Sequence, residues 1–285
     1  MIQDISPYTL DNHYKNISPD PKSKVLFIKD NSLLLKIHEG TIEFPCFEQM
    51  ADCEIDMIYL FSISGQIFFL ANANEAQYCQ VSQKLAMVGY ALHGIKSMTA
   101  RKPKWLSFAA MVGYQIGKWY DGNKYCGKCG NKLYPSQNER AMCCQACGNI
   151  IYPKICPVVI VAVVNGDRVL LTKYADRGHY DKYALVAGFT EVGETIEETV
   201  QREVMEETGV KVKNIRYYKC QPWPFSDSLL FGFFCDLDGS DEIVMDPGEL
   251  SVAQWVCRDE MQVEKEDISL TNEMMVKFKN GLEVN

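Results

Sequence analysis

The sequence lacks the long apolar runs that a membrane-spanning helix requires. Its two most apolar stretches, MIYLFSISGQIFFLA and PVVIVAVV, are interrupted by Ser, Gly and Gln or are too short, whereas roughly 20 apolar residues span a bilayer. The N-terminus, MIQDISPYTLDNHYK, has no basic segment followed by an apolar one, so no export signal is indicated. These absences predict a soluble protein of the cytoplasm that does not contact a membrane.

Positive charge is also scarce, because the formal net charge is −8. Lys and Arg supply nearly all of the non-specific affinity of proteins for nucleic acids, so broad electrostatic binding to nucleic acid is disfavoured. An anionic substrate would need a metal ion or a local basic patch. Histidine is rare as well, and His13, His38 and His93 are expected to be surface or packed residues rather than metal ligands.

The length of 285 residues and a hydrophobic content of 47% are sufficient for about two domains with real cores. Apolar runs and turn residues predict strands over 24–37 and 55–72, with turns at 30–32 and at Ser64–Gly65. Apolar spacing of three and four predicts helices over 74–98 and 102–120. The predicted division is an α+β domain over 1–122, a cysteine-rich segment over 123–153 and a third unit over 154–285.

The spacing of the twelve cysteines favours metal ligands and buried thiols over disulfides. Two Cys-x-x-Cys units, Cys126/Cys129 and Cys144/Cys147, are separated by fourteen residues, a spacing close to that of a four-cysteine zinc ribbon. Such a closed site would be structural. Cys143 is a poorer ligand candidate, and binding of RNA by the ribbon is the alternative, disfavoured because the segment has few basic residues.

Residues 188–210 contain seven glutamates, one arginine and no lysine. Earlier in the chain, Asn165–Gly166 predicts a hairpin. The glutamate-rich segment itself predicts a helix over 195–208 that ends at Gly209. At about 100° per residue, Glu203 and Glu207 fall on the same side as the apolar stripe of Ile196, Val200 and Val204. Glu197, Glu198 and Gln201 are expected to point away from it.

Two inward carboxylates repel each other and lose solvation unless a cation compensates. Oxygen ligands select hard cations such as Mg²⁺ or Mn²⁺, which also bind phosphate oxygens. Glu206 lies at the edge of this face, and Arg202 is one turn earlier, where it can pair with Glu206. The alternative is an acidic, solvated helix without a site.

The segment from Gly188 to Val210 resembles the Nudix box, because Gly188, Glu194 and REVMEETGV from Arg202 onward match its fixed positions. The Nudix hydrolases split nucleoside diphosphates linked to another group. The resemblance implies a Nudix α/β/α sandwich with a mixed sheet, in which Glu203, Glu207 and the backbone carbonyl of Ala187 hold divalent metal ions. It implies catalytic roles for Arg202, Glu203, Glu206 and Glu207, with Glu207 as the base.

A second motif, CQPWPFSDSLL over 220–230, resembles the signature of the NADH pyrophosphatases within that family. Cys220 and Ser226 replace the usual serine and proline. The order of N-terminal domain, zinc ribbon and Nudix domain is similar to that of the same group. This resemblance implies cleavage of NADH or NAD⁺ to nicotinamide mononucleotide and AMP, removal of NAD caps from RNA, and a homodimer.

Further roles follow from the same resemblance. DPGEL places Glu249 where the group has a metal ligand, although an exposed loop carboxylate is the alternative. Glu191 and Glu194 are expected to order the loop, and Glu194 is a candidate N-cap or water-mediated ligand. The residues expected to bind the substrate are Tyr152, Phe189, Gln221, Pro222, Trp223, Pro224, Phe225, Ser228 and Thr271. For Tyr152, a core aromatic is the alternative.

Two other functions remain open on the sequence. One is a broader Nudix hydrolase that acts on ADP-ribose or nucleotide sugars. The other is a zinc-ribbon protein whose Nudix domain binds a nucleotide without cutting it, which the intact Arg202, Glu203, Glu206 and Glu207 disfavour.

Overall fold

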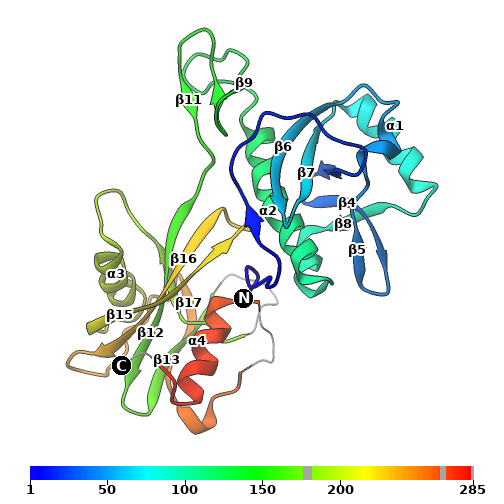
Figure 1. Cartoon of the computed structure of the whole chain (residues 1–285). Coiled ribbons are helices and arrows are strands. Elements are labelled where there is room, and N and C mark those ends of the chain that lie inside the picture. Colours follow the sequence, from blue (N-terminus) through cyan, green and yellow to red (C-terminus); the bar gives the residue numbers. More distant parts are fainter. Residues whose placement is uncertain (176–181, 264–267, 284–285) are drawn as a thin grey trace. The chain divides into compact units, whose positions relative to one another are not determined.

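The computed structural model describes residues 1–175, 182–263 and 268–283, and it divides into two compact units (Figure 1). The first unit is Gln3–Lys154, and the second is Met1–Ile2 with Ile155–Asn285. Among the described residues, no helix is both long and apolar enough to cross a membrane. The finer division into three domains stays a prediction.

The N-terminal part of the first unit contains two small sheets. The first has the order β1-β6-β7-β2, formed by Leu10–Asp11, Asp56–Ile63, Gln66–Asn72 and Lys24–Leu26. The second joins β3 (Ile28–Lys29), β4 (Ser32–His38), β5 (Thr41–Glu43) and β8 (Ala91–Gly94). Both predicted turns are confirmed, because Asp30 has a φ of 51° and Gly65 a φ of 85°. Short 3₁₀ helices are η1 (Phe47–Met50) and η2 (Ile95–Ala100).

Helix α1 (Glu75–Ala86) is shorter than predicted. The expectation of a helix over 74–98 is wrong beyond Ala86, because the chain turns at Gly89, whose φ is 92°, and continues as β8. Strand β8 pairs with β4, with His93 opposite Leu33. The apolar spacing was compatible with a helix. In the structure, the backbone hydrogen-bonding groups of β8 are paired with those of β4, so this segment forms a strand instead.

Helix α2 (Lys104–Gly122) confirms the second predicted helix and packs closely on the sheets. A Cβ atom on Gly113 would lie 2.2 Å from Leu26 Cδ2, and one on Gly117 would lie 2.2 Å from Ile28 Cδ1. The two glycines therefore let the helix backbone approach the strands, which compensates for their low helix propensity.

The cysteine-rich segment follows α2 and forms a three-stranded sheet in the order β11-β10-β9 (Figure 1). Its strands are β9 (Tyr134–Pro135), β10 (Met142–Cys143) and β11 (Ile150–Ile151). Arg140 attaches this sheet to the rest of the unit, because its guanidinium donates to the carbonyl of Leu60 and, at 3.0 Å, to Asn12 Oδ1. The Tyr14 hydroxyl adds a 2.7 Å bond to the carbonyl of Ser136.

The second unit is built around a six-stranded mixed sheet in the order β15-β16-β12-β13-β17, with β14 paired to β12. Its strands are Cys156–Asn165 (β12), Arg168–Tyr174 (β13), Val186–Phe189 (β14), Val212–Trp223 (β15), Ser228–Leu237 (β16) and Leu250–Cys257 (β17). Strands β12 and β16 are parallel, and their other neighbours are antiparallel. A 3₁₀ turn, η3 (Arg258–Glu260), follows β17.

Alternating side chains of β12 enter two separate cores, one under each helix. Val159, Val161 and Val163 pack with Val200 and Val204 of α3 (Ile196–Thr208). Ile160 and its same-face neighbours pack with α4 (Leu270–Lys279) through Met274 and Phe278. A strand that is buried on both faces requires such a continuous apolar sequence. The predicted α/β/α sandwich with a mixed sheet is therefore confirmed.

Candidate functional site

Helix α3 has defined caps at both ends, which fixes the rotation of its glutamates. The Thr195 hydroxyl accepts from the N–H of Glu198 at 3.2 Å, and the Glu198 carboxylate accepts from the N–H of Thr195 at 2.8 Å. Gly209 ends the helix in the left-handed region with a φ of 72°. The predicted helix is confirmed, but Glu194 is not its N-cap, because Thr195 occupies that position.

The inward placement of two glutamates is confirmed. Glu203 is 8% exposed and Glu207 is 2% exposed, on the same side as Val200 and Val204. Glu197, Glu198 and Gln201 are exposed, as predicted. Burial of two carboxylates one turn apart is unfavourable without a compensating charge.

Arg202 connects several of the predicted residues. Its guanidinium donates to both oxygens of Glu194, at 2.5 and 2.9 Å, to Glu203 Oε1 at 2.7 Å and to Glu206 Oε2 at 2.9 Å. It also donates to the carbonyl of Phe189 at 2.9 Å. One arginine therefore holds three glutamates together and ties them to the end of β14.

Glu194 orders the loop before α3, as predicted. It accepts from the N–H of Glu191 at 3.0 Å and from the Thr199 hydroxyl at 3.1 Å. Its bonds to Arg202 lower the pKa of Glu194 to about 2. Glu194 is therefore ionised at neutral pH and remains available to Arg202.

Gly188 provides the space into which the Glu203 carboxylate fits. A Cβ atom at position 188 would lie 1.9 Å from the carboxyl carbon of Glu203 and 2.1 Å from each of its oxygens. The adjacent Ala187 pairs with Ile160 in the centre of the sheet. The carboxylate of Glu203 therefore lies directly against the backbone of β14, the strand that contains the predicted carbonyl ligand.

Burial raises the pKa of Glu203, and the charges of Glu206 and Glu249 act in the same direction, while Arg202 opposes them. Glu249 is exposed and follows a turn in which Gly248 N–H donates to Asp246 Oδ1 at 2.8 Å. Glu249 thus acts electrostatically on Glu203 although the two are far apart in sequence. A bound cation would offset this excess of negative charge.

The four predicted zinc ligands are brought together. Within the described ranges 1–175, 182–263 and 268–283, the cysteines Cys126, Cys129, Cys144 and Cys147 are the group whose metal-ligating atoms all lie within 4.8 Å of one another. The glutamates of the α3 site do not meet that criterion. Glu203 and Glu207 share the inward side of α3, and Arg202 bonds Glu203, Glu206 and Glu194.

The two cysteine knuckles have the same backbone geometry. Gly130 and Gly148, with φ values of 76° and 71°, donate to the carbonyls of Cys126 and Cys144 at 2.8 and 2.9 Å. Such repeated turns aim both thiols of each pair at one point, as tetrahedral zinc coordination requires. The residues therefore fit a closed structural zinc site.

We expect one zinc ion per chain, and Cys144→Ser is expected to abolish zinc binding and to unfold the ribbon, because structural zinc supplies folding free energy. Elemental analysis and thermal unfolding of the purified chain would measure both effects. The control is Cys143→Ser, which changes the neighbouring cysteine outside the ligand group. Loss of zinc from the control and its retention in Cys144→Ser would contradict the assignment.

The CQPWPFSDSLL motif forms the end of β15, a turn and the start of β16. Trp223 is half-buried against the α4 core, and its ring meets that of Phe225 edge to face with a centroid distance of 5.0 Å. Pro222 and Pro224 flank Trp223, with Pro224 buried. The Ser226 and Ser228 hydroxyls are hydrogen-bonded, with their oxygens 2.9 Å apart. Ser226 occupies the position at which the motif usually has a proline, so this hydrogen bond replaces the proline ring.

Three of the residues predicted to bind substrate, Gln221, Pro224 and Ser228, are buried instead of facing solvent. Gln221 is 0% exposed, donates to the carbonyl of Ile268 at 2.6 Å and accepts from the N–H of Leu270 at 2.7 Å. Ser228 is 2% exposed. This geometry gives Gln221 a positioning role between β15 and α4, which the sequence did not indicate.

The remaining predicted residues are accessible. Phe189 is 53% exposed at the end of β14, and Thr271 is partly exposed in the first turn of α4. Tyr152 is 56% exposed in the first unit, and its hydroxyl donates to Glu139 at 3.1 Å, so the alternative of a core aromatic is wrong. The sequence did not single out Thr199, whose hydroxyl donates to the Glu194 carboxylate. The available signal for this contact was the position of Thr199, five residues after Glu194.

Comparisons with known proteins agree with this architecture. Residues 154–276 match the NUDIX domain, and residues 122–152 match the NADH pyrophosphatase zinc ribbon domain. The chain is 48% identical over 149 residues to "NAD-capped RNA hydrolase NudC" of Escherichia coli O1:K1 / APEC, a match that covers 52% of this chain and 57% of that protein. The protein of the same name from Shigella dysenteriae is 48% identical over 143 residues, with 50% and 55% covered.

The chain thus spans little more than half the length of the curated relatives that it matches. A solved structure, a Nudix hydrolase from Nitrosomonas europaea, is 24% identical with a TM-score of 0.46 and covers 54% of this chain and 88% of its own. The glutamate helix, its glycine strand and the four-cysteine knuckles lie within the matched domains. Residues 154–276 therefore match a Nudix domain, which directly follows a segment that matches a zinc ribbon of the NADH pyrophosphatase type.

Proposed function

We propose that this chain is a metal-dependent diphosphatase that hydrolyses the pyrophosphate bond of NADH and NAD⁺ to nicotinamide mononucleotide, reduced or oxidised, and AMP. We also propose that it removes NAD caps from the 5′ ends of RNA. The observation that carries the proposal is the pair of inward glutamates on α3, with Glu203 against the backbone at Gly188. The name of its relatives, NAD-capped RNA hydrolase, supports the substrate class.

Glu203, Glu207, Glu249 and the carbonyl of Ala187 would hold one or more divalent ions, Mg²⁺ or Mn²⁺. The oxygen donors suit hard cations. Burial, and after it the charges of Glu206 and Glu249, raise the pKa of Glu203, and a bound cation would favour its ionised form. A bound divalent ion would neutralise diphosphate oxygens and lower the pKa of a water molecule.

The protein residues then have separate tasks. Glu207 accepts a proton from the attacking water. Arg202 keeps its charge at all working pH values and orients Glu203 and Glu206 through the bonds described above. Phe189, Trp223 and Phe225 offer aromatic surfaces for the two bases, and such stacking contributes about 1–3 kcal/mol per base.

The assembly and location of the protein belong to the same proposal. We infer a homodimer, a cytoplasmic location, and three domains at 1–122, 123–153 and 154–285. The structural zinc ion holds the ribbon, and it takes no part in the chemistry.

A competition experiment tests the proposed activity. The purified chain with Mn²⁺ receives NADH, NAD⁺, ADP-ribose and a short NAD-capped RNA together, and mass spectrometry follows the products. Early nicotinamide mononucleotide with AMP, or with 5′-monophosphate RNA, is the expected result. Preferential release of ribose 5-phosphate from ADP-ribose would indicate a broader Nudix hydrolase, and binding without any cleavage would indicate a nucleotide-binding protein.

A further inference from the structure

The carboxyl end of helix α3 is bonded to a loop that comes much later in the chain. The last carbonyl groups of a helix have no partner within the helix. Here the N–H of Val244 donates to the carbonyl of Thr208 at 2.9 Å. The N–H of Asp246 donates to the carbonyl of Glu207, the proposed base, at 3.0 Å. A Cβ atom on Gly209 would lie 2.9 Å from that of Val244, so a glycine is needed for this close approach.

Asp246 makes three further hydrogen bonds, to the residues that follow it. Its Oδ1 accepts from the N–H of Gly248 at 2.8 Å. Its carbonyl accepts from the N–H of Glu249 at 3.3 Å and from that of Leu250 at 2.9 Å. Asp246 is thus the residue through which the backbone of Glu207 is linked to that of Glu249.

The Glu249 carboxylate is placed by its backbone. It is exposed, and within the described part of the chain it accepts no hydrogen bond. Burial raises the pKa of Glu203, and the charge of Glu249 acts in the same direction, so the two carboxylates influence each other. The position of Glu249 relative to Glu203 therefore follows from the bonds that hold its loop.

We propose that Asp246 is a positioning residue that fixes Glu249 relative to the two inward glutamates of α3. The side chain of Asp246 closes an Asx turn, which restricts the backbone just before Glu249. A ligand that is already in place loses less conformational entropy when the ion binds. The proposal rests on the proposed function for the role of Glu249 as a metal ligand.

Mn²⁺ binding tests this role without any substrate. Electron paramagnetic resonance of free Mn²⁺ measures the Kd of the full, zinc-loaded chain. Asp246→Ala is expected to raise this Kd at least about tenfold, because loss of a residue that orients a metal ligand costs about 10–100-fold in affinity. Unchanged Mn²⁺ binding in a folded Asp246→Ala protein would overturn the proposal.

Asp246→Asn separates the hydrogen bond of the side chain from its charge. Its Kd for Mn²⁺ is expected to stay within about threefold of the original, because the amide oxygen of asparagine can accept the same bond from the N–H of Gly248. Equal losses in Asp246→Asn and Asp246→Ala would overturn the positioning role, since the negative charge of Asp246 would then be what the ion requires.

A double-substitution cycle shows whether Asp246 acts through Glu249. Glu249→Gln alone is expected to weaken Mn²⁺ binding at least as much as Asp246→Ala does. When Glu249→Gln is already present, Asp246→Ala should change the Kd by less than about twofold, because the two residues share one interaction. Full additivity would overturn the proposal. So would unchanged Mn²⁺ binding in Glu249→Gln, which decides the question even if Asp246→Ala does not fold.

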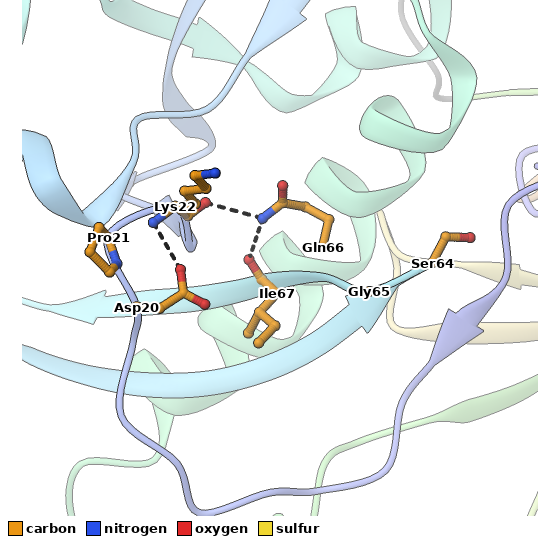
Figure 2. Close-up of a pocket in the computed structure, with 7 residues that line it drawn as sticks. All are labelled: Asp20, Pro21, Lys22, Ser64, Gly65, Gln66 and Ile67. Atoms are coloured by element: carbon orange, nitrogen blue, oxygen red, sulfur yellow. Dashed lines mark hydrogen bonds between the residues drawn. The ribbon is translucent and has the colours of Figure 1, made fainter.

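The matched control is Asp20→Ala, which removes the same kind of turn from the other unit. Residues 20–21 repeat the Asp-Pro sequence of residues 246–247. Figure 2 shows this turn beside a surface pocket, where the N–H of Lys22 donates to Asp20 Oδ1 at 2.8 Å. The Kd for Mn²⁺ should stay within about twofold of the original. An equal loss in Asp20→Ala and Asp246→Ala would overturn the proposal, because it would reflect a general loosening of the fold.

Hydrolysis separates this proposal from the proposed function. If the unaltered chain binds Mn²⁺ but does not cleave NADH, the proposed function fails, and the Mn²⁺ titrations still decide the role of Asp246. If NADH is cleaved while Asp246→Ala binds Mn²⁺ as tightly as the original, only the role of Asp246 fails. Absence of Mn²⁺ binding by the unaltered chain would overturn both.

Discussion

Gly188→Ala is expected to lower kcat for NADH at least about 100-fold while the protein stays folded. The new Cβ would lie 1.9 Å from the Glu203 carboxyl carbon, and the carboxylate is the flexible end of its side chain, so it moves instead of the backbone. Displacement of a ligand by about 1 Å can cost this much activity. Steady-state kinetics with Mn²⁺ would measure it, together with the thermal unfolding midpoint.

Gly94→Ala provides the matched control for that experiment. A Cβ at Gly94 meets no atom within 4 Å, and its φ of −61° is accessible to alanine. Activity of this variant is expected to match that of the original chain. Full activity of Gly188→Ala would show that Glu203 is not needed in its observed position against β14.

Glu207→Gln is expected to lower hydrolysis by roughly 10²–10⁴-fold, because the amide cannot act as a general base and is a weaker ligand for a hard cation. Binding of an ion to the folded state raises stability, so Mn²⁺ should raise the unfolding midpoint of the original chain much more than that of the variant. The midpoint without Mn²⁺ should not fall, because the change removes a buried charge.

Glu197→Gln is the appropriate control, because it removes the same charge from the solvent side of the same helix. Zinc content should be the same in all three proteins. If Glu207→Gln kept its activity and its response to Mn²⁺, Glu207 would be neither base nor ligand. If Glu197→Gln lost both, the effect would reflect the net charge of the helix.

The features predicted well from sequence are those set by local rules. The rotation of α3 follows from its period and its caps, so the order of residues along the helix is enough to place Glu203 and Glu207 on the inward side. The cysteine knuckles are likewise short turns with fixed spacing. Both depend on residues within a few positions of one another.

The features that were missed depend on partners far apart in the chain. Helix α1 ends early because β8 pairs with β4, more than 50 residues away. The sequence placed Arg202 beside Glu206 but could not show that it also closes the loop through Glu194 and Phe189. Gln221 was assigned to substrate binding through resemblance, whereas its amide lies 47 residues in sequence from the carbonyl to which it donates.

The buried Gln221 amide also makes two distant segments move together. It bonds to the backbone on either side of the start of α4, so the Trp223 hairpin cannot separate from α4 without exposing both polar groups. The first turn of α4 and the hairpin therefore open as one cooperative unit. Hydrogen exchange at the Leu270 amide, which donates to the Gln221 side chain, would report that opening.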